Sequence, residues 1–192
     1  MTKPNSPTFN IYFLYGPEEY LIEEEVRKLL DQTLSPKERG LNLHLFNGEE
    51  YSGQEIVQTA QTLPMFSQHR FVLIRGADQF DDENVEALLH YIRNPSPATC
   101  LVMCAQTAGP WKRYQKEMEK VGKVVEYLRL KGMGLVSWVK KRMEEKGKSI
   151  SEEASNYLIE VVGDHLQDLD NGLEKVFLMV GDRKKETFSN PL

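Results

Sequence analysis

The most constraining feature of this sequence is a series of five short apolar runs, separated by segments with helical spacing. Four of the runs are apolar almost throughout, and the second alternates weakly. Continuous apolar strands are typical of a parallel sheet with helices on both faces, because neither side of such a strand meets water. The predicted strands are Asn10–Tyr15, Leu41–Phe46, Phe71–Ile74, Thr99–Ala105 and Val124–Leu128.

The intervening segments predict helices. The clearest helix start is Ser52, because Glu55 three residues later completes a capping box. After Gly132 the alternation stops and only helical patterns follow. The chain therefore divides into an α/β domain over residues 1–131 and a small three-helix domain over residues 132–192. The predicted helices are Glu18–Leu34, Ser52–Thr62, Asp81–Ile92, Trp111–Val121, Leu135–Lys146, Ser151–Val162 and Leu166–Val180.

Composition narrows the class of protein. The chain carries a formal net charge of −5, which argues against a strongly basic DNA-coating protein. No apolar run approaches the roughly 20 residues of a membrane-spanning helix, and the polar start Met1–Pro7 lacks the apolar core of a secretory signal. With two cysteines in the whole sequence, we expect no disulfide scaffold, no membrane partner and a reducing, cytoplasmic setting.

Positive charge is concentrated in one segment. Residues 111–148 hold 12 lysines and arginines against 5 acids, a net of +7, and both flanking regions are acidic. Solvated helix faces explain such a segment more simply than a nucleic-acid contact does. A weak auxiliary contact with DNA stays open as the alternative. Its candidate residues are Lys112, Arg113, Lys116, Lys120 and Lys123.

The loop after the first strand is where a nucleotide-binding fold would hold phosphate. With Gly16 as the first glycine of the pattern G-x-x-x-x-G-K-[ST], the second glycine, the lysine and the hydroxyl are replaced by Leu21, Ile22 and Glu23. The first replacement is too bulky for a backbone cradle. The other two remove the phosphate-pairing cation and the magnesium-binding hydroxyl. The acids that crowd this segment would also repel phosphate.

The third strand lacks the other half of a nucleotide-hydrolysing site. Such a site needs acids directly after the strand to hold magnesium, but Arg75 and Gly76 stand there, and Asp78 fits a turn or helix start. We therefore expect a non-catalytic relative of a nucleotide-binding fold, with no cofactor. The alternative is a nucleotide-dependent enzyme with an atypical phosphate loop.

Other catalytic or metal chemistry is not indicated. Cys100 and Cys104 fall on one face of a predicted strand but about 13 Å apart, too far for a shared metal or a disulfide. They are predicted to be small core residues. The histidines show no metal-ligand spacing, and no G-x-S-x-G elbow is present.

A connection that should be polar is instead apolar. The segment Thr62–Ser67 joins a predicted helix to a predicted strand and carries Leu63, Pro64, Met65 and Phe66. Methionine and phenylalanine at a projecting turn are common anchors for protein partners, because they offer a large apolar area. Both could equally pack back onto the core, and the residues alone leave the two interpretations open.

Taken together, the ordered blocks of this sequence resemble one family, the delta subunit of the bacterial DNA polymerase III clamp loader. The resemblance spans about residues 11 to 180, and the order and spacing of the blocks carry it. The matching blocks are Tyr12–Glu24, Leu43–Glu50, Gln61–Ser67 followed by Arg70–Asp78, and Asn171–Lys175.

The resemblance implies an AAA+-type module without ATPase function, followed by a small helical lid domain. In this family, delta binds the ring-shaped sliding clamp and holds one interface open, and an apolar pair at the tip of the first domain enters a pocket on the clamp. Met65 and Phe66 match that pair, with Leu63 and Pro64 beside them. The expected partners are the sliding clamp and the other loader subunits.

Three departures from the family pattern stand out. The helical collar domain that joins delta to the other loader subunits is not in this sequence, which resembles the first two domains. Gln167 stands near the position of a nucleotide-sensing arginine in active relatives, and Gly172 stands where glutamate is usual. Glycine costs roughly 1 kcal/mol inside a helix.

Overall fold

The computed structural model describes residues 8–180 and 187–188. The chain forms two compact units, Met1–Leu128 and Arg129–Leu192. The division falls just after the last strand of the large sheet, close to the domain boundary expected from the sequence. Within the described residues, no helix combines the length and apolar character needed to cross a membrane.

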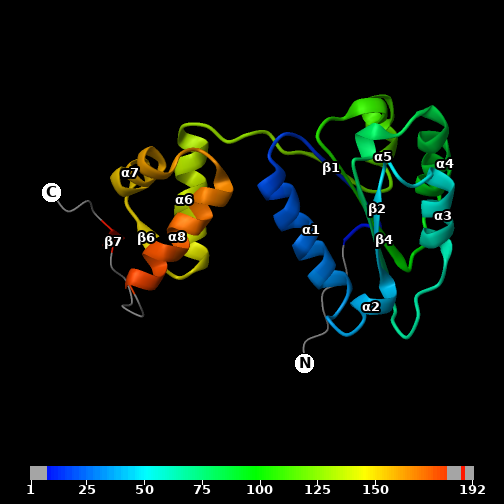
Figure 1. Ribbon diagram of the computed structural model, residues 1–192, viewed down its shortest axis with the longest axis horizontal. Helices are drawn as coiled ribbons and strands as arrows, with labels where there is room; N and C mark the ends of the chain where they lie inside the picture. The colour runs from blue at the N-terminus through cyan, green and yellow to red at the C-terminus, as the bar shows by residue number, and fades with distance from the viewer. Residues whose placement is uncertain (1–7, 181–186, 189–192) are drawn as a thin grey trace. The chain divides into compact units, whose positions relative to one another are not determined.

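The first unit is built on a five-stranded sheet in the order β2-β3-β4-β1-β5. Every strand pair in this sheet is parallel, which confirms the predicted architecture. The order places β1 in the interior of the sheet, between β4 and β5, and leaves β2 and β5 at the edges (Figure 1). The strands are β1 (Ile11–Tyr15), β2 (Leu43–Asn47), β3 (Arg70–Arg75), β4 (Thr99–Ala105) and β5 (Lys123–Glu126).

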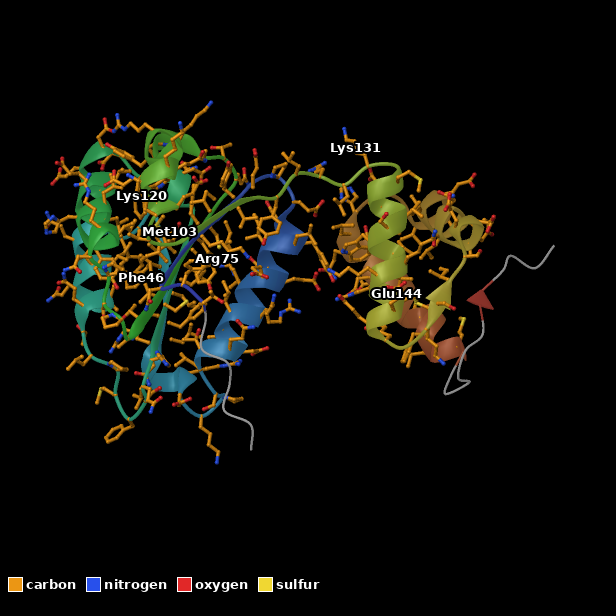
Figure 2. All side chains as sticks on the ribbon, turned by 180° about the vertical axis from the view of Figure 1, so that it is seen from behind. Phe46, Arg75, Met103, Lys120, Lys131 and Glu144 are labelled. Atoms are coloured by element: carbon orange, nitrogen blue, oxygen red, sulfur yellow. The ribbon has the colours of Figure 1, made fainter. Side chains whose placement is uncertain are left out.

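Helices cover both faces of the sheet, and this explains the continuous apolar strands. Helix α1 (Glu19–Thr33) packs on one face, and helices α3 (Gly53–Gln61) and α4 (Asp82–Arg93) pack on the other (Figure 1). Neighbouring strand residues enter opposite cores: Leu14 joins the α1 side and Phe13 joins the α3–α4 side. Side chains fill both layers (Figure 2).

The helix-start signals behave as predicted. The Ser52 side chain accepts a hydrogen bond from the Glu55 amide, and the Glu55 side chain accepts one from the Ser52 amide, so the capping box is complete. At the start of α4, the Asp81 side chain accepts a hydrogen bond from the Asn84 amide. These side chains satisfy amides that have no partner within the first helical turn.

The second predicted strand begins too early. Residues Arg39–Asn42 form a short helix, α2, so Leu41 lies outside β2. In β2 itself, Leu45 is 62% exposed. The strand lies at the edge of the sheet, where a partly solvated strand is tolerated. The weak alternation over 41–46 therefore reflects a helix-to-strand junction and an edge strand.

The predicted helix Trp111–Val121 is not a single helix. A 3₁₀ segment, η2 (Gly109–Tyr114), leads into the short helix α5 (Gln115–Met118). The Trp111 side chain is fully buried, and its Nε1 donates to the carbonyl oxygen of Ala77 at 2.7 Å. We attribute the tighter 3₁₀ winding to this buried contact.

The described part of the second unit holds three helices, α6 (Met133–Glu145), α7 (Glu152–Val162) and α8 (Leu166–Val180). It also holds two short parallel strands, β6 (Ser149–Ile150) and β7 (Thr187–Phe188), which the sequence did not predict. A two-residue strand is too short to show a periodic pattern. The rest of the predicted polar tail, 183–192, lies outside the described residues.

Gly172 lies on the side of α8 that faces α7. A Cβ at this position would lie 3.4 Å from Val162 Cγ2 and 3.6 Å from Leu158 Cδ1, which is ordinary van der Waals contact. The contacts around this residue therefore do not explain why glycine stands where glutamate is usual.

Candidate functional site

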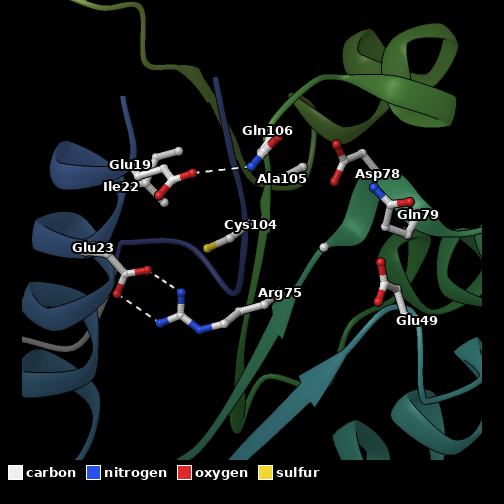
Figure 3. Close-up of a pocket in the computed structure, with 11 residues that line it drawn as sticks. Glu19, Ile22, Glu23, Glu49, Arg75, Asp78, Gln79, Cys104, Ala105 and Gln106 are labelled. Carbon is white, nitrogen blue, oxygen red and sulfur yellow. Dashed lines mark hydrogen bonds and ion pairs between the residues drawn. The ribbon is translucent and has the colours of Figure 1, made fainter. Parts of the chain in front are cut away.

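A pocket lies at the carboxyl edge of the large sheet, where an open α/β fold places its ligand site. Its volume is about 360 Å³. Residues from α1, from the ends of β3 and β4, and from the segments that follow β2, β3 and β4 line it (Figure 3). The lining includes the expected nucleotide-site residues Ile22, Glu23, Arg75 and Gly76.

The loop after β1 is too short to form a phosphate cradle. Strand β1 ends at Tyr15 and α1 begins at Glu19, so Leu21, Ile22 and Glu23 all lie inside α1. The loop amides are also occupied, because Gly16 N donates to Ala105 O and Glu18 N donates to Tyr127 O, each at 3.1 Å. A phosphate-binding loop needs such amides to point at the ligand.

Gly16 has a packing role in this loop. Its φ is +129°, and a Cβ at this position would lie 2.3 Å from the carbonyl oxygen of Tyr127. The backbone after β1 therefore passes directly against the backbone after β5, and only glycine fits.

An ion pair occupies the positions where a nucleotide site would hold its hydroxyl and its magnesium-binding acid. Arg75, the last residue of β3, forms a two-pronged ion pair with Glu23 of α1, and Arg75 Nη2 lies 2.9 Å from Glu23 Oε2 (Figure 3). The hydrogen bond from Arg75 lowers the pKa of Glu23, and the same bond raises the pKa of Arg75. The two charges neutralise each other inside the pocket.

Two further polar side chains of the pocket, Asp78 and Gln106, are engaged in structural contacts. Asp78 lies in the 3₁₀ segment η1 (Ala77–Gln79), and one carboxylate oxygen accepts hydrogen bonds from the amide and the hydroxyl of Thr107 at 3.2 and 3.3 Å. Gln106 donates to Glu19 across the pocket (Figure 3). Among the described residues, no cluster of three or more histidines, cysteines or acids could hold a metal ion.

Cys100 and Cys104 are core residues, as predicted. Both are buried free thiols in the layer under α1. Burial raises the pKa of each thiol to about 12, so neither offers a reactive thiolate at neutral pH.

We expect Glu23→Gln to have a small, pH-dependent effect on stability. The pKa of Glu23 is lowered from its ordinary value of 4.5 in the folded chain. The ion pair therefore stabilises the fold above pH 4.5, and this stabilisation is lost as the pH falls through the lowered pKa. At pH 7 the loss in unfolding free energy should be below about 1 kcal/mol, because both side chains are about half exposed. Urea unfolding at pH 7 and pH 3.5 tests this, and a difference that persists unchanged at pH 3.5 would contradict it.

The candidate DNA-contact residues lie on η2 and α5. Lys112, Arg113 and Lys116 are exposed. Arg113, however, forms an ion pair with Asp82 and lies 4.9 Å from the centre of the Tyr114 ring. Nearby, Glu117 is paired with Arg93. The charge of Arg113 is therefore compensated within the fold, whereas Glu117 pairs with a cation outside the basic segment.

Gln167 lies in the second unit. It is exposed at the start of α8, and its Nε2 lies 3.5 Å from Asn171 Oδ1.

The apolar segment between α3 and β3 projects into solvent. Leu63 is 75% exposed, Met65 52% and Phe66 91%, and Pro64 is half-buried. In the free chain these side chains do not pack back onto the core, so that alternative is wrong. We call residues Leu63–Phe66 the tip. Because it precedes β3, it lies at the amino edge of the sheet, opposite the pocket (Figure 1).

Sequence reasoning missed two buried polar residues beneath the tip. Asn42 is 1% exposed and Arg70 is 4% exposed, and both form hydrogen bonds with tip backbone. Asn42 was included in a predicted strand, which hid its role. The only available signal was a polar residue inside an apolar run.

Comparison with known proteins identifies the family. The model of the family described as DNA polymerase III, delta subunit, matches residues 12–128. The chain therefore belongs to the DNA polymerase III delta subunit family.

Two curated relatives match nearly the whole chain. DNA polymerase III subunit delta of Bacillus subtilis is 26% identical over 190 residues, which cover 94% of this chain and 55% of the relative. The probable DNA polymerase III subunit delta of Aquifex aeolicus is 24% identical in an alignment of 194 positions, which covers 95% of this chain and 53% of the relative. The chain thus spans about half the length of these relatives.

Solved structures agree with the fold. The DNA clamp loader delta protein of Bacillus subtilis superimposes with a TM-score of 0.80 at 26% identity, covering 93% of this chain and 56% of that protein. A RuvB Holliday junction branch migration motor of Thermotoga maritima gives a TM-score of 0.53 at 13% identity, covering 89% of this chain and 56% of that one. The predicted AAA+-like α/β fold followed by a helical region is therefore confirmed.

Proposed function

We propose that this chain binds the sliding clamp of its own replication machinery through the tip and favours the open form of the ring. The observation that carries the proposal is the exposure of Leu63, Met65 and Phe66 at one projecting turn. Apolar side chains of this size at a projecting turn are suited to fill a pocket on a partner. Membership in a clamp-loader family makes the clamp the partner to test.

The proposed mechanism involves no covalent chemistry. A protein that binds the open clamp more tightly than the closed clamp shifts the population toward the open ring. Each tenfold difference in affinity between the two forms contributes about 1.4 kcal/mol to the shift. The tip would supply that difference by contacts that the closed ring permits less well.

ATP hydrolysis is not part of the proposed role. The pocket at the carboxyl edge holds the Glu23–Arg75 ion pair, and the loop amides after β1 are bonded to Ala105 and Tyr127. Binding a nucleotide there would require breaking these contacts and placing phosphates among several acids. We therefore assign the chain a non-catalytic part in the loader.

Partners other than the clamp are assigned more coarsely. The curated relatives are longer than this chain, and we assign contacts with the other loader subunits to the collar domain expected from the family. DNA contact through Lys112, Arg113 and Lys116 would be weak, because Asp82 pairs with Arg113 and the regions that flank this segment are acidic. Such contact would show as a salt-dependent affinity for duplex DNA.

The proposed function predicts clamp binding that does not depend on nucleotide. The chain should bind the purified clamp with the same dissociation constant, within twofold, in the presence and absence of Mg·ATP. Isothermal titration calorimetry measures both values, and a titration of the chain with Mg·ATP alone should give no binding heat.

Two outcomes would contradict the proposal. Failure of a folded chain to bind the clamp under either condition would exclude the clamp-binding role. Binding that requires Mg·ATP would instead support the nucleotide-dependent alternative, and would show that the pocket at the carboxyl edge still accepts a ligand.

A further inference from the structure

The backbone of the tip is held from below by Asn42. Its Nδ2 donates to the carbonyl oxygen of Met65 at 2.9 Å, and its Oδ1 accepts from the amide of Met65 at 2.8 Å. The same Nδ2 also lies 3.2 Å from the carbonyl oxygen of Glu38. Asn42 is 1% exposed, so it cannot itself contact a partner.

The conformation next to this anchor is unusual. Phe66 has a φ of +54°, and among the described residues no other non-glycine residue has a positive φ. A bulky side chain rarely adopts this conformation, and it persists only where its surroundings fix it. Met65, which directly precedes Phe66, is tied to the last residue of α2 by both hydrogen bonds of Asn42.

A second anchor comes from the start of β3. Arg70 Nη2 donates to the carbonyl oxygen of Leu63 at 3.0 Å, and Nη1 contacts the ring of His44 in β2. The backbone is therefore fixed at both ends of the tip. Its apolar side chains remain exposed, because only backbone atoms are used for the anchoring.

We propose that Asn42 is a positioning residue that holds the tip in its clamp-binding conformation before the clamp arrives. The proposal rests on the clamp-binding function argued above. Asn42 acts through Met65 and Phe66 and makes no contact with the clamp. The anchored tip then binds without first having to be ordered.

The expected effect follows from populations. If the tip of an Asn42→Ala chain occupies the binding conformation for about one tenth of the time, its apparent affinity falls about tenfold. The dissociation constant should therefore rise about tenfold, with no change in the contacts made once the tip is bound.

The experiment compares Asn42→Ala with a matched control, Asn10→Ala. The Asn10 side chain also binds backbone, donating to the carbonyl oxygens of Ser96, Pro97 and Thr99, and none of these belongs to the tip. Clamp affinity is measured at a temperature where all variants are folded. Asn10→Ala should bind as tightly as wild type, and Asn42→Ala about tenfold more weakly.

Two further readouts separate positioning from a general loss of stability. In the free chain, hydrogen exchange of the Met65 amide should accelerate in Asn42→Ala and stay unchanged in Asn10→Ala. The reason is that Asn42 Oδ1 accepts a hydrogen bond from the Met65 amide. In a Phe66→Ala background, Asn42→Ala should weaken clamp binding by less than it does in wild type, because the group that it positions is gone.

Each outcome decides one question. If wild type binds the clamp and Asn42→Ala binds equally well, the positioning role is wrong while the clamp-binding function stands. If wild type does not bind the clamp, the clamp-binding function is wrong and so is the role assigned to Asn42. Unchanged exchange at Met65 would by itself overturn the anchoring.

Discussion

Replacing Met65 and Phe66 together by alanine should weaken clamp binding at least 100-fold, about 2.7 kcal/mol, since paired apolar anchors of this kind carry much of an interface's free energy. The same double variant should unfold at nearly the wild-type temperature. Met65 is 52% exposed and Phe66 is 91% exposed, so their removal takes little apolar area out of the folded core. Calorimetric titration with the clamp and a thermal melt measure the two effects.

A second pair of apolar side chains provides the control. Leu178 and Met179, on α8, are adjacent in sequence and are 75% and 87% exposed. Leu178→Ala/Met179→Ala removes comparable apolar surface from the second unit, and it should leave clamp binding within twofold of wild type. Equal losses in the two double variants would mean that exposed apolar surface in general, and not the tip, mediates binding.

Gly16→Ala should destabilise the first unit by about 3 kcal/mol, because overpacking and backbone strain act together there. The added Cβ would lie 2.3 Å from the carbonyl oxygen of Tyr127, at a φ of +129°. The clash involves backbone on both sides, so no side-chain rotation relieves it. The urea midpoint should fall with little change in slope.

Gly40→Ala is the matched control. A Cβ at Gly40 meets no atom within 4 Å, and the residue lies in α2, where alanine is the better helix former. This variant should be as stable as wild type or more stable. If Gly16→Ala proved equally harmless, that result would contradict the close approach between the backbone after β1 and the backbone after β5. The glycine would then be free to serve the phosphate loop that we exclude.

The fold could be predicted largely because local and tertiary signals agree. The buried strands β1, β3 and β4 are apolar on both faces, so their runs stand out in the sequence whatever the register. Strand β2 was misplaced because it lies at an edge, where burial no longer enforces a pattern. The η2–α5 segment was misassigned because the buried contact of Trp111 with Ala77 is tertiary and leaves no local trace.

The candidate site was predictable in part. The departures of residues 16–23 from a phosphate-loop pattern and the apolar tip could be seen in single segments. The Glu23–Arg75 pair could not, because its members are far apart in sequence and meet only when α1 packs beside β3. Asn42 was missed for the same reason. Strand β2 and helix α3 separate it from its partner Met65 in the sequence, and no residue near Asn42 indicates that contact.

The polar side chains at the carboxyl ends and at the amino ends of the strands have different roles. At the carboxyl edge, the Glu23–Arg75 ion pair lies in the pocket. At the amino edge, polar side chains hold the backbone of the tip and leave its apolar side chains exposed. The family to which the chain belongs gives the exposed tip a partner to be tested, the sliding clamp.

The most direct test is photo-cross-linking from the tip to the clamp. A chain with p-benzoylphenylalanine in place of Phe66 should cross-link to the clamp on irradiation, at peptides that line one apolar pocket, and excess wild-type chain should suppress the reaction. The same group in place of Met179 should give no cross-link. Cross-linking from position 179 but not from position 66, while the chain binds the clamp, would contradict the central claim that the tip is the clamp-binding site.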